Sequence, residues 1–132
     1  MNTFYEQYKD QLSKMKSIVR YIDSIKQDIE FKVGGNAQEN FDLIDASNPQ
    51  DLWFHISANP SCHVVACLPE DLDLDKKQLL KVATQGAVIC KQHSKQKSEK
   101  DVAVVYCRIE NVTKSEVKVG SVTITNEKII KI

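Results

Sequence analysis

Residues 51–64, with the sequence DLWFHISANPSCHV, hold the only Trp of the chain and two of its three His. Strand-forming residues flank the turn formers Asn59 and Pro60. This pattern predicts a β-hairpin with strands at about 52–57 and 63–68. The most versatile side chains of the protein are therefore expected on one hairpin.

Side chains alternate along a strand, so the first strand of this hairpin has two different faces. One face is apolar and is expected to enter a core; it carries Leu52, Phe54 and Ile56. The other face carries Trp53 and His55. The loop length decides whether His63 meets His55, because a shift of one residue moves every side chain to the opposite face.

The apolar spacing in the rest of the chain predicts further elements. They are helices over residues 3–19, about 37–43 and about 75–94, a hairpin over 20–33, and strands over 101–108 and 120–131. Asn36 is a good N-cap for the second helix, and Glu39 completes the pattern of a capping box. Together these elements predict one α+β domain, with a largely antiparallel β-sheet and two or three packed helices. We expect residues 1–21 to form a helical extension of a domain that spans 22–132.

The composition excludes several classes of protein. No apolar run approaches the roughly 20 residues that span a bilayer, and the N-terminus has no apolar signal core. The four Cys show no pattern of a secreted disulfide scaffold, which favours a reducing compartment and a cytoplasmic location. Eighteen basic residues balance eighteen acidic ones, so any polyanion must meet a local basic patch.

Trp53 admits two interpretations. It is a core aromatic, or it is a platform for a stacked base, which contributes roughly 1–3 kcal/mol. We expect an intermediate position, partly buried beside His55 and the Asn59-Pro60 loop.

A metal site or a nucleophile would be rival explanations of this stretch. The candidate side chains are His55, Cys62, His63, Cys67, Cys90 and His93. They lack the short-spaced ligand pairs of structural zinc sites, and adjacent strand residues point to opposite faces. No orienting group is evident for a Cys62 nucleophile. We therefore expect no metal, no cofactor and no catalytic residue, and we expect Asp51 to cap a strand end.

Two further features are typical of anion binding. A strand that enters Gly34-Gly35-Asn36 and then a helix is expected to leave backbone N–H groups pointing outward, which suits a phosphate. The segment 91–100 contains four Lys and suits a polyanion, although most charge runs are solvated loops.

Taken together, these residues resemble a known family. The motifs are V-G-G-N-A-Q-E-N (33–40), D-L-W-F-H (51–55), P-S-C-H-V-V (60–65), C-K-Q-H-S-K (90–95), V-A-V-V-Y (102–106), N-V-T-K (111–114) and G-S-V (120–122). They resemble the NFACT-R domain over about residues 22–132. That domain is the presumed RNA-binding module of the NFACT proteins, which include ribosome-associated quality-control factors and bacterial fibronectin-binding-like proteins.

The resemblance implies a stand-alone, non-enzymatic RNA-binding module of translation quality control. Its expected partners are ribosomal RNA or tRNA and proteins of the translation machinery, with no membrane. By position, Asp51 and Pro60 match the family pattern, whereas Gly35 stands where the family usually has Arg or Lys. The residues expected to contact nucleic acid are Gly34, Gly35, Asn36, Asn40, Trp53, His55, His63, Lys91, Ser94, Lys95, Lys97 and Lys114.

Two other functions stay open from the sequence. One is a protein–protein or DNA-binding adaptor, which the zero net charge favours. The other is an RNA-modifying or RNA-cleaving enzyme that uses His55, His63 and Asp51.

Overall fold

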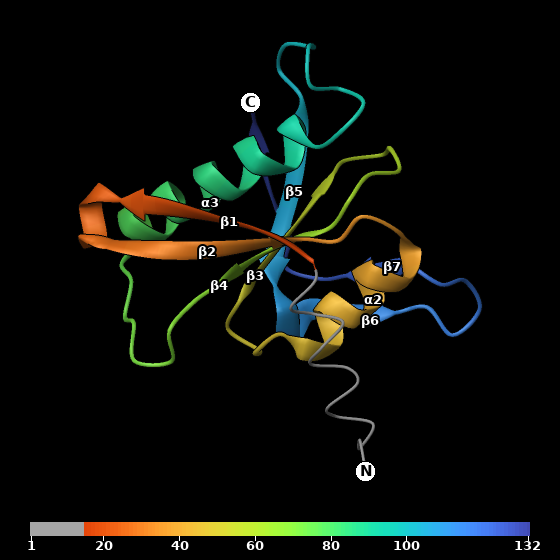
Figure 1. Ribbon diagram of the computed structural model, residues 1–132, viewed down its shortest axis with the longest axis horizontal. Coiled ribbons are helices and arrows are strands. Elements are labelled where there is room, and N and C mark those ends of the chain that lie inside the picture. Colours follow the sequence, from red (N-terminus) through yellow and green to blue (C-terminus); the bar gives the residue numbers. More distant parts are fainter. Residues whose placement is uncertain (1–14) are drawn as a thin grey trace.

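Strands with alternating apolar residues build a six-stranded antiparallel sheet in the computed structural model, which describes residues 15–132 (Figure 1). The strands are β1 (Lys16–Ile22), β2 (Gln27–Val33), β3 (Leu52–Ile56), β4 (Val64–Cys67), β5 (Ala103–Arg108) and β8 (Lys128–Lys131). Their order across the sheet is β1-β2-β4-β3-β5-β8. The β3–β4 hairpin therefore occupies the centre of the sheet.

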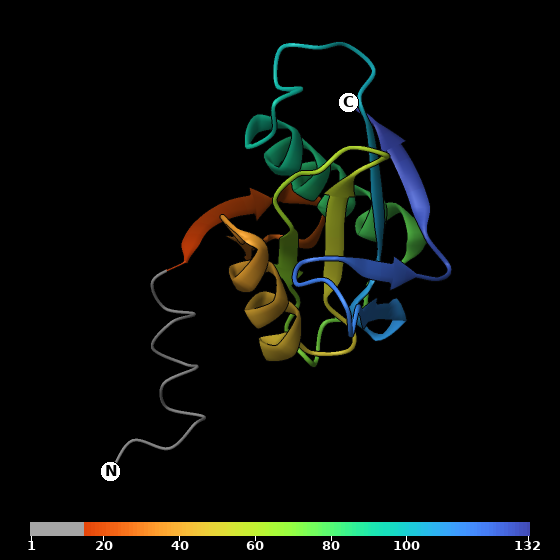
Figure 2. The same ribbon diagram turned by 90° about the vertical axis from the view of Figure 1, so that its right-hand side faces the viewer.

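Two helices and a small sheet cover the two faces of the large sheet. Helix α3 (Lys76–Gln92) packs on one face. Helix α2 (Ala37–Ala46) and a two-stranded sheet of β6 (Val112–Lys114) and β7 (Val122–Ile124) pack on the other. Figure 2 looks onto this second face, with α2 on one side of the central strands and β7 on the other. Short 3-10 turns complete the chain at η1 (Asp23–Ile25) and η2 (Ile109–Asn111).

Alternate side chains of β3 therefore lie in two different hydrophobic cores. Leu52, Phe54 and Ile56 lie in the core under α3, as expected. Trp53 lies in the second core, with Leu43 from α2. Both faces of the sheet are buried because each has its own covering layer.

The register of the hairpin brings the two histidines together. Trp53 pairs with Val65 and Phe54 with Val64, so His63 extends the face that carries Trp53 and His55. The ring centroids of His55 and His63 are 5.3 Å apart. Of the alternatives that the sequence left open, the structure has the one in which the two rings meet.

The α+β class and the antiparallel sheet are confirmed, but two predicted elements need correction. The predicted helix over residues 3–19 is wrong at 16–19, which belong to β1; residues 3–14 of it lie outside the described part. The predicted strand over 120–131 is two strands in different sheets, β7 and β8, and β6 was not predicted. The boundary between residues 21 and 22 stays a prediction, and β1 runs across it.

Candidate nucleic-acid interface

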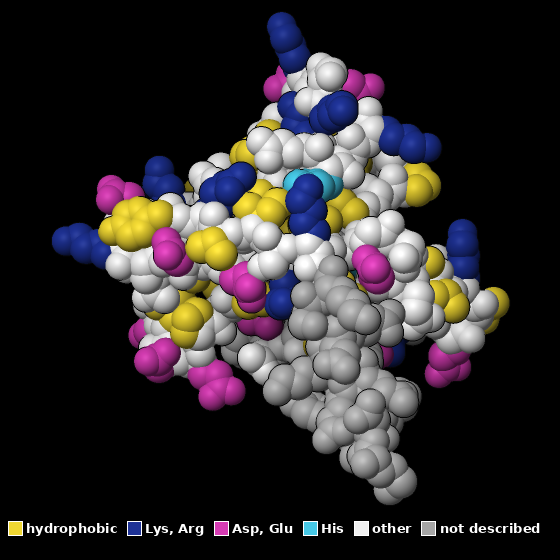
Figure 3. Space-filling view, in the orientation of Figure 1, with side chains coloured by type: hydrophobic (Ala, Val, Ile, Leu, Met, Phe, Trp, Pro, Cys, Tyr) yellow, Lys and Arg dark blue, Asp and Glu magenta, His cyan; other side chains and the backbone are white. Residues whose placement is uncertain are grey.

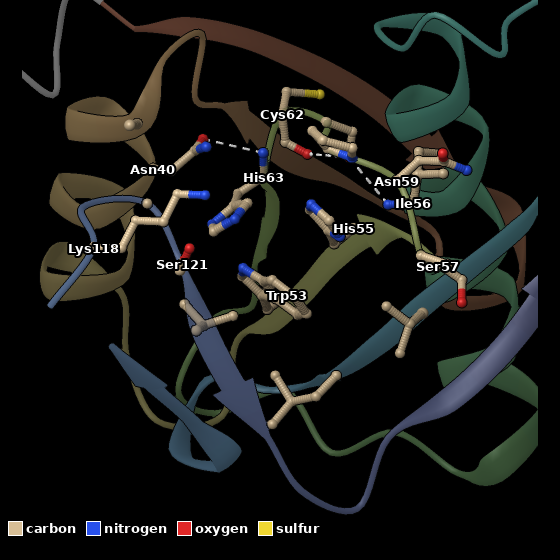
Figure 4. A pocket seen from close by; sticks show the side chains of 18 of the residues that line it. Asn40, Trp53, His55, Ile56, Ser57, Asn59, Cys62, His63, Lys118 and Ser121 are labelled. Atoms are coloured by element: carbon tan, nitrogen blue, oxygen red, sulfur yellow. Dashed lines mark hydrogen bonds between the residues drawn. The ribbon is translucent and has the colours of Figure 1, made fainter. Parts of the chain in front are cut away.

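The central strands, α2 and the β6–β7 loop enclose a hollow of about 860 Å³ on the second face of the sheet (Figure 4). Six of the predicted contact residues line it; they are Gly35, Asn36, Asn40, Trp53, His55 and His63. A smaller hollow of about 380 Å³ adjoins it and contains Gly34, Ser94 and Lys95. The two share Gly35 and the segment 60–62. Most of the predicted residues therefore converge on one surface.

Three rings pack against one another in the large hollow. His55 stacks on Trp53, with centroids 5.7 Å apart and planes 7° from parallel. His63 meets Trp53 edge-on, with centroids 5.0 Å apart and planes at 83°. Trp53 is only 1% exposed, so the core alternative holds and the expected intermediate position is wrong. Its burial follows from α2 and the small sheet, which cover this face.

Both histidines of this cluster are neutral near pH 7. Burial, with a smaller contribution from the nearby His55, lowers the pKa of His63 to about 3. Burial also lowers the pKa of His55. A neutral imidazole has one N–H donor and one acceptor nitrogen, so the pair offers hydrogen bonds without positive charge.

Two buried nitrogens of the cluster have no hydrogen-bond partner within residues 15–132. They are Nε1 of Trp53 and Nδ1 of His63. Figure 4 shows the indole nitrogen on the edge of Trp53 that faces His63 and Ser121. An unsatisfied buried polar group costs about 1–3 kcal/mol, so these atoms mark a place where a ligand would gain hydrogen bonds.

The segment 33–40 holds the backbone of His63 in place. The N–H of His63 donates to Oδ1 of Asn40 at 3.1 Å, and its carbonyl accepts from the N–H of Gly34 at 2.9 Å. A Cβ on Gly34 would lie 2.3 Å from the same Asn40 oxygen, so only glycine permits this approach. Gly34 and Asn40 are therefore positioning residues for His63.

The expectation of free N–H groups at the Gly34-Gly35-Asn36 turn is wrong. The N–H of Gly34 is bound to His63, and that of Gly35 donates to Oε1 of Glu39 at 2.8 Å. Asn36 caps α2 as predicted, since its Oδ1 accepts from the N–H of Glu39 at 2.8 Å. The Glu39 carboxylate occupies the place where a phosphate was expected.

The predicted lysines divide into two that are bound to other groups of the protein and two that lie exposed at the surface. Lys91 donates to the backbone oxygen of Ile132 at 2.9 Å, and Lys114 forms an ion pair with Asp45. Both therefore have structural partners. Lys95 lines the smaller hollow, next to the turn that the Ser94 hydroxyl stabilises by donating to the Lys91 carbonyl, and Lys97 is exposed.

The surface charge is unevenly distributed. Figure 3 shows Lys and Arg side chains around the C-terminal end of α3 and the loop that follows it. Acidic side chains gather on the opposite side, near the loop that precedes α3. A neutral chain thus carries a local basic region close to the two hollows.

The structure places Asp51 apart from the two histidines. Asp51 does not line the hollow; its two carboxylate oxygens accept the N–H groups of Leu68 and Asn48, each at 2.8 Å. This confirms Asp51 as a strand-end cap, and burial raises its pKa. Cys62 packs toward the opposite core from His63, and its thiol meets the thiol of Cys90. That contact lowers the pKa of Cys62 and raises that of Cys90.

The sequence did not single out the β6–β7 loop as part of the site. Lys118, Gly120 and Ser121 all line the large hollow. Gly120 has a φ of +88°, and a Cβ there would lie 2.8 Å from Cβ of Ala37, so the loop turns tightly against the start of α2. The Gly-Ser-Val motif at 120–122 was the one feature of the sequence from which this loop could have been identified.

Two properties of residues 15–132 concern other kinds of site. No three His, Cys, Asp or Glu side chains there form a group that would hold a metal ion. None of the helices in that range has the length and apolar character to cross a membrane.

Comparisons with known proteins agree with this architecture. The C-terminal region of the fibronectin/fibrinogen-binding protein from Streptococcus suis has a similar structure, with a TM-score of 0.73 and 25% sequence identity. The match covers 90% of this chain and 45% of that one, so this chain spans less than half of its length. A search of curated protein sequences found no match. The sequence model of the NFACT protein RNA binding domain matches residues 9–126. The chain therefore belongs to the NFACT RNA-binding domain family.

Proposed function

We propose that this chain is a non-enzymatic RNA-binding module that acts in the cytoplasm with ribosomes or tRNA, in translation quality control. The observation that carries the proposal is the convergence of residues from four separate segments on one hollow of about 860 Å³. Those segments contribute Asn40, Trp53, His63 and Ser121. Family membership supports RNA as the partner.

The lysines around the two hollows support binding of a polyanion. Lys118 lies at the large hollow, and Lys16 and Lys95 lie at the smaller one. All three are exposed, so RNA phosphates reach them without loss of a structural contact. Contacts of this kind release counterions and make binding sensitive to salt.

The state of the histidines supports a binding role rather than catalysis. RNA cleavage by two histidines needs one that donates a proton near neutral pH. The pKa of His63 lies at about 3, so this ring is not an imidazolium at pH 7 and does not supply the general acid. The carboxylate of Asp51 is bound to the backbone and does not line the hollow, so Asp51 does not orient either ring.

A titration of short RNAs against matched variants tests the proposal. We expect the wild-type protein to bind single-stranded RNA or tRNA and to leave it intact. Replacing Lys95 and Lys118 with Ala should weaken binding, whereas Lys128→Ala should not, because Lys128 lines neither hollow. Equal affinity of all variants, or RNA cleavage that His55→Ala abolishes, would refute the proposal. Co-sedimentation with ribosomal subunits, or tRNA recovered by crosslinking in cells, tests the cellular partner.

A protein–protein adaptor is the second candidate. The edge strand β1 exposes Val19 by 54% and Tyr21 by 60% of their surfaces. Within residues 15–132 the outer edge of β1 has no partner strand, and such an edge is a template for another chain. If Val19→Lys and Tyr21→Lys abolish ribosome association while the affinity for isolated RNA is unchanged, the adaptor function is favoured.

A further inference from the structure

We propose that the large hollow takes one unpaired nucleobase of the bound RNA, which accepts a hydrogen bond from the indole N–H of Trp53 and forms another with His63. The phosphates flanking that base stay at the rim, near Lys118. This inference rests on the proposed RNA-binding function and assigns a ligand class to its central cavity.

The buried nitrogens set the first requirement for the ligand. Trp53 is 1% exposed and His63 is 2% exposed, yet Nε1 of the first and Nδ1 of the second have no partner within residues 15–132. The indole N–H only donates, so the ligand must present an acceptor there. A neutral imidazole beside it either donates or accepts, according to its tautomer. The edge of a nucleobase carries acceptors next to donors and satisfies both groups.

The walls set the second requirement, which disfavours a phosphate in the interior. Apolar side chains form much of the lining; they include Val105, Val122, Ile124 and Ile129. Both imidazoles are neutral, and the carboxylate of Glu127 also lines the hollow. A negatively charged phosphodiester would lose its hydration against these apolar and neutral walls. A flat, uncharged heterocycle would lose little.

His55 forms part of the wall of the hollow. One face of its ring stacks on Trp53, and the residue is half-buried at the hollow. Because His55 covers a face of the indole, the base meets the edge of Trp53 that carries Nε1.

The β6–β7 loop lies beside the two nitrogens. Both atoms are screened from solvent, and Figure 4 shows Lys118 and Ser121 beside them. The loop is closed at its base by the Ser115 N–H, which donates to the Ser121 carbonyl at 2.8 Å. Val117 near its tip is 97% exposed. The base would enter on the side where Lys118 and Ser121 line the hollow.

The single Trp makes a direct test possible, because the indole N–H of Trp53 gives one signal in a ¹H–¹⁵N NMR spectrum. The wild-type protein is titrated separately with adenosine, guanosine, cytidine, uridine and ribose 5-phosphate. We expect at least one nucleoside to shift the indole signal, and ribose 5-phosphate to leave it in place. A shift with ribose 5-phosphate but with no nucleoside would overturn the proposal, as would no shift with any probe.

A second measurement separates this inference from the proposed function. Trp53→Phe keeps an aromatic ring and removes the N–H, so affinity for a short unstructured RNA should fall about 2- to 10-fold with an unchanged salt dependence. RNA binding that leaves the wild-type indole signal unmoved would refute the base site and leave the RNA-binding function standing. If RNA does not bind at all, the proposed function fails, and the nucleoside titration still decides the base site without any variant.

Discussion

At the scale of single residues, Trp53 serves the core and the hollow at once. Its ring is buried between the sheet and the layer of α2, β6 and β7, and its N–H has no partner within residues 15–132. His55 and His63 lie against the same ring. Changes at these positions should therefore separate packing from hydrogen bonding.

We predict that Trp53→Ala lowers the free energy of unfolding by about 3–5 kcal/mol, because it empties a well-packed site. His55→Ala should cost less, because His55 is only half-buried. Urea unfolding followed by circular dichroism measures both variants. An unchanged unfolding midpoint for Trp53→Ala would contradict its place in the second core.

We predict that His63 makes the protein sensitive to acid. Its pKa is about 3 when folded, against the ordinary 6.5 when unfolded, so below pH 6.5 only the unfolded chain gains the proton. The stabilising contribution of His63 is complete above pH 6.5 and is lost as the pH falls toward 3, by up to about 1.4 kcal/mol per pH unit. Urea unfolding at several pH values should show this slope in the wild type and a flatter one in His63→Gln. Equal slopes would refute the assignment.

At the scale of elements, the start of α2 acts as a latch on the β3–β4 hairpin. Asn40 on the helix binds the N–H of His63, and Gly34 at the end of β2 binds its carbonyl. Asn36 caps the same helix through the N–H of Glu39. The conformation of the hairpin loop therefore depends on close contact between β2 and α2.

The two neighbouring glycines provide a matched test of this latch. A Cβ on Gly34 meets Asn40 Oδ1 at 2.3 Å and its Cα at 3.2 Å, so Gly34→Ala should break the bond to His63 and cost about 1–3 kcal/mol. A Cβ on Gly35 meets only the flexible end of Glu39, at 3.2 Å, so Gly35→Ala should cost less than about 0.5 kcal/mol. Urea unfolding and the NMR shift of the His63 amide measure the difference. Similar effects of the two changes would argue against the latch.

At the scale of the whole molecule, basic side chains cluster locally although the net charge is zero. The basic side chains near the end of α3 and in the β6–β7 loop flank the two hollows, and the acidic segment before α3 lies away from them. RNA is therefore expected to approach from one side of the protein.

We predict that RNA affinity falls with salt at a slope of log K against log salt near −2 to −3, at roughly 0.7 per phosphate of single-stranded RNA. Replacing Lys95, Lys97 and Lys118 with Ala should flatten the slope by about 2. Lys91→Ala is the control, because Lys91 is bound to the backbone oxygen of Ile132. If the triple variant has the same slope as the wild type, these lysines do not contact RNA phosphates.

The sequence was sufficient for features that depend on neighbouring residues. Alternation in 52–56 correctly placed Phe54 in a core, and Asn36 was correctly predicted as an N-cap. The period of apolar residues correctly predicted α3 to within two residues at each end. These are local preferences, because a strand or helix repeats its own geometry along the chain.

Only the tertiary structure decided how these pieces form a site. The burial of Trp53 needs α2 and the small sheet, and the meeting of His55 with His63 needs the register of the hairpin. Glu39 binds the turn that was expected to bind phosphate, and Lys118 reaches the hollow from a loop more than fifty residues away along the chain. The alternation of residues along a strand predicts the face on which each side chain lies. What covers that side chain depends on segments distant in sequence, whose packing is set by the free energy of the whole fold.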